Sequence, residues 1–381
     1  MKRLALLAIL MLSALPVCAQ RKVPEINTET PEGALLQKIG QENDEKAKLG
    51  LMEQFVSQFS TSAASGWVLG QMQPIYIKNS QWDKAIDAGE KILAADPADT
   101  EIAQNSLKAA EAKKDVDLIV KWSDNTSAAA RKAIASPKPK DEEEAETWKK
   151  TVDYARQVDT YTEYAIYAQA LQSADPKKRL DLLQHLEMRN PDSQYLANTQ
   201  TQIFQLLVQT GQKDKAAALG EKILQKDGTN DDVLLVVAGY YYEGNKDKVK
   251  ALQYAQKLAE VAPTKPKPEG VADDDWNNRK MLKAGIANWM IGIMASNDGK
   301  WADADKALRA ALPNLKGNID LQAETLFHLG LANFKMGDAK ANKQRILDAL
   351  RFNQQCAAIK SRFQPQALKN IAAIKSQYKI Q

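Results

Sequence analysis

Residues 235–263, LVVAGYYYEGNKDKVKALQYAQKLAEVAP, decide the fold of this chain of 381 residues. Their apolar side chains recur three and four positions apart, which predicts helices rather than strands. Gly239 in the first half and Ala251 in the second let neighbouring helices approach closely, and Pro263 cannot continue a helix. The stretch therefore predicts two packed helices that end at this proline.

Related stretches recur along the chain. Segments 80–85 (SQWDKA), 211–216 (GQKDKA) and 299–304 (GKWADA) align without gaps, and the first two continue into the same pentapeptide, GEKIL, at 89–93 and 220–224. We find no convincing alternation of apolar and polar residues that would indicate strands. A helix pair cannot bury its apolar face alone, so recurring pairs are expected to stack on one another. Close helix approach is predicted at the small residues Gly239, Gly292, Gly330, Ala85, Ala216, Ala251 and Ala304.

These features resemble the tetratricopeptide repeat (TPR), whose period of about 34 residues carries a small–Gly pair, an aromatic residue, a later alanine and a closing proline. The most complete match is L-x-x-A-G-x-x-Y at 235–242 with Ala251 and Pro263. The segment 326–330 also matches, although Asn333 stands where the family has an aromatic residue. The resemblance implies an all-α, TPR-like α-solenoid of stacked antiparallel helix pairs.

Two proline-rich linkers interrupt the repeats, one near 136–140 and one near 263–270. Each leads into an acidic cluster and then a tryptophan, Trp148 or Trp276, which indicates two extended units of one type. Acidic residues are typical of helix starts, and residues 141–173 are predicted to form one long helix.

The boundaries follow from these patterns. Residues 20–62 are predicted to form an N-terminal segment and a helix, with Thr30 as its N-cap and Pro31 in its first turn. Residues 63–381 are predicted to form the TPR-like domain.

The first residues have the layout of a secretory signal peptide. Lys2 and Arg3 precede an uncharged apolar run at 4–15, and small residues precede a cleavage site that we place after Ala19. The run is too short to span a bilayer permanently. Lipidation of Cys18 is the alternative, but the preceding valine suits it poorly. We therefore expect residues 1–19 to be removed and the chain to be exported, as a periplasmic or secreted protein.

Composition and charge indicate what kind of protein this is. Hydrophobic residues make up 44% of the chain and charged residues 26%, which is ordinary for a folded domain. The C-terminal end is basic, because residues 336–381 contain nine Lys and Arg against two Asp. We expect this basic surface to contact an anionic envelope surface rather than nucleic acid, or to be only a solvated face. Its main members are Lys340, Lys343, Arg345, Arg351 and Arg362.

Nothing in the sequence favours catalysis. His185, His328 and Cys356 are far apart in sequence, and the cysteine is expected to be a buried packing residue. No His/Cys pair has metal-ligand spacing, and no phosphate-binding glycine loop is present, so neither a metal nor a cofactor is expected.

The resemblance also implies where a partner binds, because the first helix of each TPR unit lines the concave surface that binds ligands in the family. Lys, Arg and Asn residues that would clamp a C-terminal carboxylate are missing from the inward positions, which become apolar toward the C-terminus. Two interpretations stay open, an exposed groove for a peptide or helix and an apolar strip that the chain's own helices fill. The groove hypothesis names Tyr240, Trp289, Met290, Ile293, Phe327, His328 and Leu331.

The sequence therefore predicts a non-catalytic scaffold of the bacterial cell envelope that binds a protein or peptide partner. A structural subunit of an oligomeric envelope assembly is one alternative. An enzyme accessory subunit with an unrecognised site is another, and a deep pocket that joins His328 or Cys356 to carboxylates would favour it.

Overall fold

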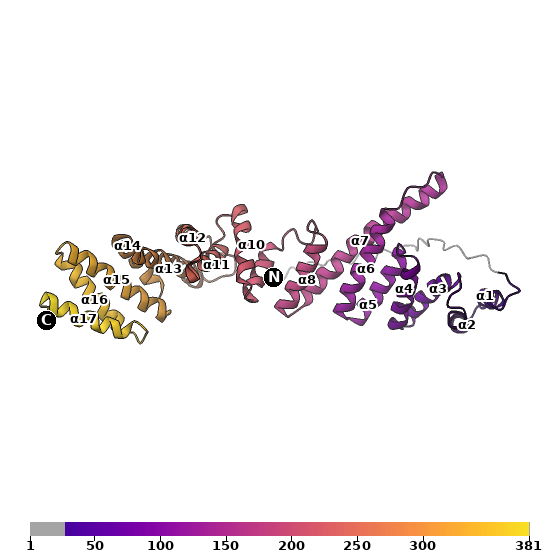
Figure 1. The fold of residues 1–381 in the computed structure, drawn as a ribbon, viewed down its shortest axis with the longest axis horizontal. Helices are drawn as coiled ribbons and strands as arrows, with labels where there is room; N and C mark the ends of the chain where they lie inside the picture. Colours follow the sequence, from indigo (N-terminus) through magenta and orange to yellow (C-terminus); the bar gives the residue numbers. More distant parts are fainter. Residues whose placement is uncertain (1–26, 381) are drawn as a thin grey trace. The chain divides into compact units, whose positions relative to one another are not determined.

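The computed structural model describes residues 27–380 (Figure 1), which form α-helices, three short 3-10 helices and connecting turns, with no strand among them. This confirms the all-α fold class. The predicted signal peptide and Cys18 lie outside the described residues. Within the described range, no helix is both long and apolar enough to cross a membrane.

The chain divides into two compact units, and the first ends at Asn198. Each of its helices packs against the next, and α3 also contacts α5, while α5 contacts α7. Contacts between alternate helices are what stacked helix pairs produce. The helices of this unit are α1 (Pro31–Gln41), α2 (Glu45–Gln58), α3 (Ser65–Lys78), α4 (Trp82–Ala95), α5 (Thr100–Lys113), α6 (Val116–Ile134), α7 (Glu142–Gln172) and α8 (Pro176–Arg189).

The second unit begins at Thr199 and is built in the same way. Consecutive helices pack together, and α13 contacts both α11 and α15. Its elements are α9 (Gln200–Gln209), α10 (Lys213–Lys226), α11 (Asp231–Tyr242), η1 (Glu243–Asn245), α12 (Lys248–Val261), η2 (Ala262–Thr264), α13 (Asp273–Asn297), α14 (Trp301–Ala311), η3 (Leu312–Asn314), α15 (Ile319–Ala339), α16 (Lys343–Ala357) and α17 (Gln364–Tyr378). The boundaries of a single repeat domain over 63–381 stay a prediction.

The helices of the two units correspond in order. Helices α4, α5 and α7 begin 131 residues before α10, α11 and α13, respectively. The long helices α7 and α13 each follow a linker, and a tryptophan of each helix binds the linker before it. Trp148 Nε1 donates to the Ser136 carbonyl at 3.1 Å, and Trp276 Nε1 donates to the Lys265 carbonyl at 3.2 Å. The two extended units therefore hold their linkers by the same kind of contact.

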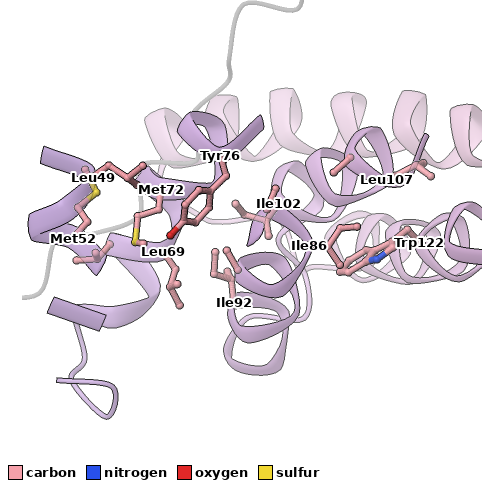
Figure 2. Close-up of a cluster of buried hydrophobic side chains, with 14 of the residues drawn as sticks. Leu49, Met52, Leu69, Met72, Tyr76, Ile86, Ile92, Ile102, Leu107 and Trp122 are labelled. Atoms are coloured by element: carbon pink, nitrogen blue, oxygen red, sulfur yellow. The ribbon is translucent and has the colours of Figure 1, made fainter. Parts of the chain in front are cut away.

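The core of the first unit is a continuous apolar layer between these helices (Figure 2). Trp122 of α6 is fully buried in it, and Tyr76 is 5% exposed. Other members from α2 to α5 are Leu49, Met52, Leu69, Met72, Ile86, Ile92, Ile102 and Leu107.

The N-terminal segment differs from its prediction. The structure has two helices, α1 and α2, where the sequence predicted one. Thr30 does cap α1, because its Oγ1 accepts from the Gly33 N–H, and Pro31 lies in the first turn. Asp44 then accepts from the Ala47 N–H and starts α2, so a second capping residue divides the segment. The long helix predicted over 141–173 is confirmed as α7.

The small residues were mostly interpreted correctly. Each of the four alanines named in the sequence is at most 1% exposed. A Cβ added at Gly292 would lie 2.5 Å from Leu308 Cγ, and one added at Gly330 would lie 2.5 Å from Asn353 Nδ2. Gly239 is the exception, because a Cβ there would meet nothing within 4 Å. The prediction that Gly239 permits close helix approach is therefore wrong.

Two glycine substitutions test this packing. Gly292→Ala should lower the free energy of unfolding by about 1–3 kcal/mol, because the new methyl group overpacks the contact with Leu308. Gly239→Ala should leave stability unchanged or raise it by up to about 1 kcal/mol, because alanine favours a helix. Chemical denaturation measures both, and equal losses in the two variants would contradict the packing described.

Candidate functional site

The predicted groove residues come from α11, α13 and α15, but the structure separates them. Met290 is 1% exposed and Ile293 is 4% exposed, so both lie in the core between helices. Tyr240 is half-buried and faces other neighbours: its hydroxyl donates to Asp214 Oδ1 at 2.8 Å, and the Lys246 Nζ lies 3.7 Å from its ring centroid. Only the half-buried members of the set are therefore accessible from outside the core.

Four half-buried aromatic side chains form what we call the aromatic cluster, Tyr242, Trp289, Phe327 and Phe363. All four pack against the same group of core residues. The rings of Tyr242 and Trp289 meet edge-on, with centroids 5.1 Å apart. The rings of Phe327 and Phe363 stack, also with centroids 5.1 Å apart. Helices α11, α13 and α15 and the turn before α17 each supply one member.

Polar atoms at this cluster are incompletely satisfied. The Nε1 atom of Trp289 is buried and has no hydrogen-bond partner among the described residues. Burial, together with the negative charge of Glu324, raises the pKa of Tyr242 to about 12, so its hydroxyl stays protonated. An indole N–H that is buried without an acceptor costs free energy, and its burial keeps it from acceptors in the solvent.

His328 lies beside the cluster, with its ring 5.5 Å from that of Phe327. Its Nδ1 and the Oγ of Ser296 lie 2.8 Å apart and form a hydrogen bond. Burial lowers the pKa of His328 to about 4, so the ring is neutral near pH 7. Leu331, one turn further along α15, is half-buried. His328 therefore serves here as a neutral packing and hydrogen-bonding residue.

An ion pair borders the aromatic cluster. The Nη2 of Arg362 donates to Glu324 Oε1 at 3.0 Å, and its guanidinium carbon lies 4.7 Å from the ring centroid of Phe363. The Glu324 side chain is 15% exposed, whereas that of Arg362 is 76% exposed. Glu324 is thus mostly buried in the fold, whereas Arg362 covers it from the solvent side.

Sequence reasoning named Trp289, Phe327 and His328 but missed Tyr242, Glu324 and Phe363 as site residues. Tyr242 had been identified only as the aromatic position of its repeat. Phe363 lies in a turn after α16, and the inward helix positions that guided the prediction do not include it. The Phe327–Phe363 stack also shows that the chain fills part of the predicted groove itself.

The predicted basic surface is partly neutralised. Arg345 pairs with Asp305 at 2.7 Å, Arg351 pairs with Asp348 at 3.2 Å, and Arg362 pairs with Glu324, as described above. Lys340 and Lys343 are exposed. Contact with an anionic surface stays a prediction.

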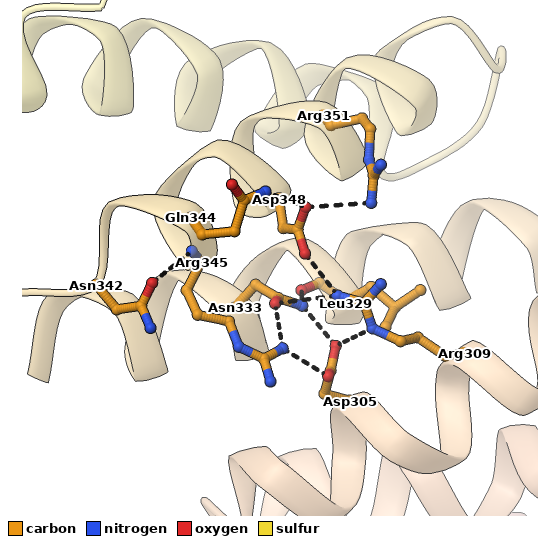
Figure 3. Close-up of polar contacts among 9 residues, drawn as sticks. All are labelled: Asp305, Arg309, Leu329, Asn333, Asn342, Gln344, Arg345, Asp348 and Arg351. Carbon is orange, nitrogen blue, oxygen red and sulfur yellow. Dashed lines mark hydrogen bonds and ion pairs between the residues drawn. The ribbon is translucent and has the colours of Figure 1, made fainter. Parts of the chain in front are cut away.

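A polar network fastens α14, α15 and α16 together (Figure 3). Asp305, 6% exposed, accepts from Arg309 Nε at 2.8 Å, Asn333 Nδ2 at 2.6 Å and Arg345 Nη1 at 2.7 Å. Arg309 also reaches Asp348 at 2.9 Å. Burial alone would raise the pKa of Asp305, but the hydrogen bonds from Arg345, Asn333 and Arg309 hold the pKa below its usual value.

The network explains the departure from the TPR pattern. Asn333 stands where the family has an aromatic residue, and here its amide joins a buried acid to two arginines. The helix that follows this unit's first helix is present as α16. We therefore assign this polar cluster to holding helices in place rather than to binding.

The geometry supplies little for catalysis. Cys356 is fully buried, its thiol contacts the Ala323 carbonyl at 3.4 Å, and burial raises its pKa to about 11. Over residues 27–380, no group of three His, Cys, Asp or Glu could hold a metal ion. In unit 1, His185 Nε2 lies 3.0 Å from Asp124 Oδ1, beside Arg189.

Comparison with known proteins gives fold-level similarities alone. No protein-family profile and no curated protein sequence matches the chain. Among solved structures, it is similar to the TPR domain of P58(IPK), with 11% identity, 92% of this chain and 88% of that chain covered, and a TM-score of 0.27. It is similar to yeast Tom70, with 11% identity and a TM-score of 0.22, and the match covers 93% of this chain and 97% of that chain. It is also similar to human IFIT1, solved as a dimer with m7Gppp-AAAA, with 15% identity and a TM-score of 0.30. That match covers 90% of this chain and 84% of that chain. Because these TM-scores lie below 0.5, the description of stacked helix pairs relies on this chain's own packing.

Replacing Asn333 tests the polar network. Asn333→Leu keeps the side-chain volume but removes a donor to Asp305 and an acceptor for Arg345, so the free energy of unfolding should fall by about 1–3 kcal/mol. Asn288→Leu is the matched control, because that half-buried amide donates only within its own helix, to the Ala284 carbonyl. Urea denaturation of both variants measures the difference, and a more stable Asn333→Leu protein would refute the network's role.

Proposed function

We propose that this chain is a non-catalytic, protein-binding scaffold of the bacterial cell envelope, and that a peptide or helix of its partner binds at the aromatic cluster. The observation that carries the proposal is the convergence of four half-buried aromatic side chains from three helices and a turn. A surface with these properties is suited to recognition rather than to chemistry.

Aromatic side chains support this role energetically. Tyr, Trp and Phe are enriched at protein interfaces, because they bury a large apolar area and lose little rotamer freedom. Tyrosine and tryptophan also offer a polar atom at the edge of the ring. Here the indole N–H of Trp289 is itself buried, whereas Tyr242 keeps a protonated hydroxyl. A partner that supplies an apolar side chain and an acceptor for the Tyr242 hydroxyl would match this surface.

The envelope location in this proposal is supported by the first residues of the sequence. Lys2, Arg3 and the apolar run at 4–15 have the layout of an export signal. The chain beyond Ala19 has one cysteine, Cys356, which is buried and free. Such a chain depends on packing rather than on a disulfide for its stability, as the close helix contacts allow.

The charge distribution favours a second candidate, a structural subunit of an oligomeric assembly. Residues 27–198 contain 28 acidic and 21 basic residues, whereas residues 199–381 contain 19 acidic and 27 basic residues. The two parts therefore carry net charges of −7 and +8. Opposite charges on two parts of one chain favour association between copies, and this attraction weakens with salt.

Two aromatic substitutions test binding at the cluster. Trp289→Ala combined with Phe327→Ala should weaken capture of envelope partners by roughly 30-fold or more, the loss expected at the centre of an interface. Affinity capture from solubilised envelopes, quantified for each bound protein, measures the loss, and helical circular dichroism should be preserved.

The control is Phe334→Ala, which removes the same type of ring from the same helix, α15. Phe334 packs on Tyr378 instead, with centroids 6.4 Å apart. The proposal fails if the double variant recovers as much partner as the wild-type protein, or if Phe334→Ala loses the same proteins to the same extent.

A further inference from the structure

Glu324, the carboxylate beside the aromatic cluster, has an unusual ion-pair partner. Glu324 lies on α15 one turn before Phe327, and its side chain is 15% exposed. Among residues 27–380, Arg362 is its one ion-pair partner. That arginine belongs to the turn between α16 and α17 rather than to a helix, and its side chain is 76% exposed. A carboxylate fixed in the fold is thus paired with a cation held from the solvent side.

The surroundings of the guanidinium are those of a cation-binding site. It lies over the ring of Phe363, with 4.7 Å between its central carbon and the ring centroid, and it donates to the carboxylate at 3.0 Å. Tyr242 lies near enough for both charges to act on its hydroxyl, in opposite senses. A carboxylate beside aromatic rings attracts a cation through ionic and cation–π interactions together.

The two partners of the ion pair differ in what they lose on separation. An exposed arginine regains hydration and rotamer freedom when it leaves, so an exposed ion pair contributes little to stability. A mostly buried carboxylate without a cation loses far more, because burial opposes its charge. Glu324 therefore favours any cation that can reach it, and Arg362 can be exchanged at small cost.

We propose that Arg362 is an internal occupant of a cation-binding site formed by Glu324 and the aromatic cluster, and that an arginine side chain of the partner displaces it. This inference rests on the proposed function, because it places one partner side chain in the same site. The displaced Arg362 swings into solvent, and its guanidinium is replaced by another in the same contacts.

Arginine fits this site better than lysine does. A guanidinium is planar, stacks on aromatic faces and is more weakly hydrated than an ammonium group, so it loses less hydration in an aromatic setting. The net charge of +8 on residues 199–381 repels a basic partner at long range. At physiological salt, however, charges are screened beyond about 8 Å, and direct contact with Glu324 then decides binding.

A small probe isolates the site. The full-length protein, labelled with ¹⁵N, is titrated with N-acetyl-arginine N-methylamide, and the indole N–H signal of Trp289, assigned with Trp289→Phe, reports binding. Arg362→Ala should bind the probe about two- to fivefold more tightly than the wild-type protein, because the internal competitor is gone. Arg362→Gln, which keeps a polar side chain of similar reach, should show the same gain.

Matched controls separate charge from contact. Arg351→Ala removes an arginine that pairs with Asp348 elsewhere in the same unit, and it should leave the affinity for the probe unchanged. Adding Glu324→Gln to Arg362→Ala should abolish the preference for the arginine probe over its neutral isostere, N-acetyl-citrulline N-methylamide. Loss of that preference shows that the carboxylate recognises the charge.

Three results would overturn the inference: unchanged or weaker binding of the arginine probe in both Arg362 variants, equal binding of the citrulline probe, or a wild-type signal that moves only with N-acetyl-glutamate N-methylamide. The last result would mean that Arg362 recognises an acidic partner. If partner capture still depends on Trp289 and Phe327, the scaffold proposal stands while the cation site falls. If the probe binds as expected but capture does not depend on those residues, the proposed function falls instead.

Discussion

The close approach of helices at small residues is the constraint on which the second unit depends. Ala251 and Ala304 are fully buried, and Gly292 leaves no room for a methyl group beside Leu308. Packing at this distance fixes how far α13 lies from α14, and hence where the side chains on its other faces point. Ala251 also lies in the group of core residues against which Tyr242 and Trp289 pack, so a larger residue there would displace both rings. The aromatic cluster is therefore a consequence of the repeat packing.

The second unit holds two buried or mostly buried acids, Asp305 and Glu324, whose partners differ in exposure. In the network around Asp305, every charge is matched by residues of neighbouring helices, and Asn333 completes it from the position where a TPR has an aromatic ring. Such a network fixes the register of three helices, because a buried acid must keep its partners. At Glu324 the acid is similarly fixed, but its partner comes from a turn and is mostly exposed. The partners of Asp305 are therefore fixed by packing, whereas the proposed site at Glu324 can exchange its cation.

Much of the fold could be predicted from the sequence, because small residues, prolines and acidic helix starts act locally. The long helix α7, the caps of α1 and the buried alanines follow from such signals. The errors have two causes. Only tertiary packing shows that Gly239 has no close neighbour, whereas the break at Asp44 follows a local capping signal that the prediction did not use. Of the site, Trp289 and Phe327 could be named from the repeat register, but Met290 and Ile293 lie in the core. Phe363 reaches the cluster only through the turn after α16, which no periodic pattern marks, and the same turn brings Arg362 to Glu324.

The proposed contact with the partner lies on the aromatic cluster. Site-specific photocrosslinking in the native cell envelope tests it most directly, with p-benzoylphenylalanine placed at Phe327 or, as a reference, at Val249, which is 77% exposed on α12. A discrete adduct is expected from position 327 and not from position 249. Adducts of the same pattern from both positions, or none from position 327 while position 249 yields one, would contradict it.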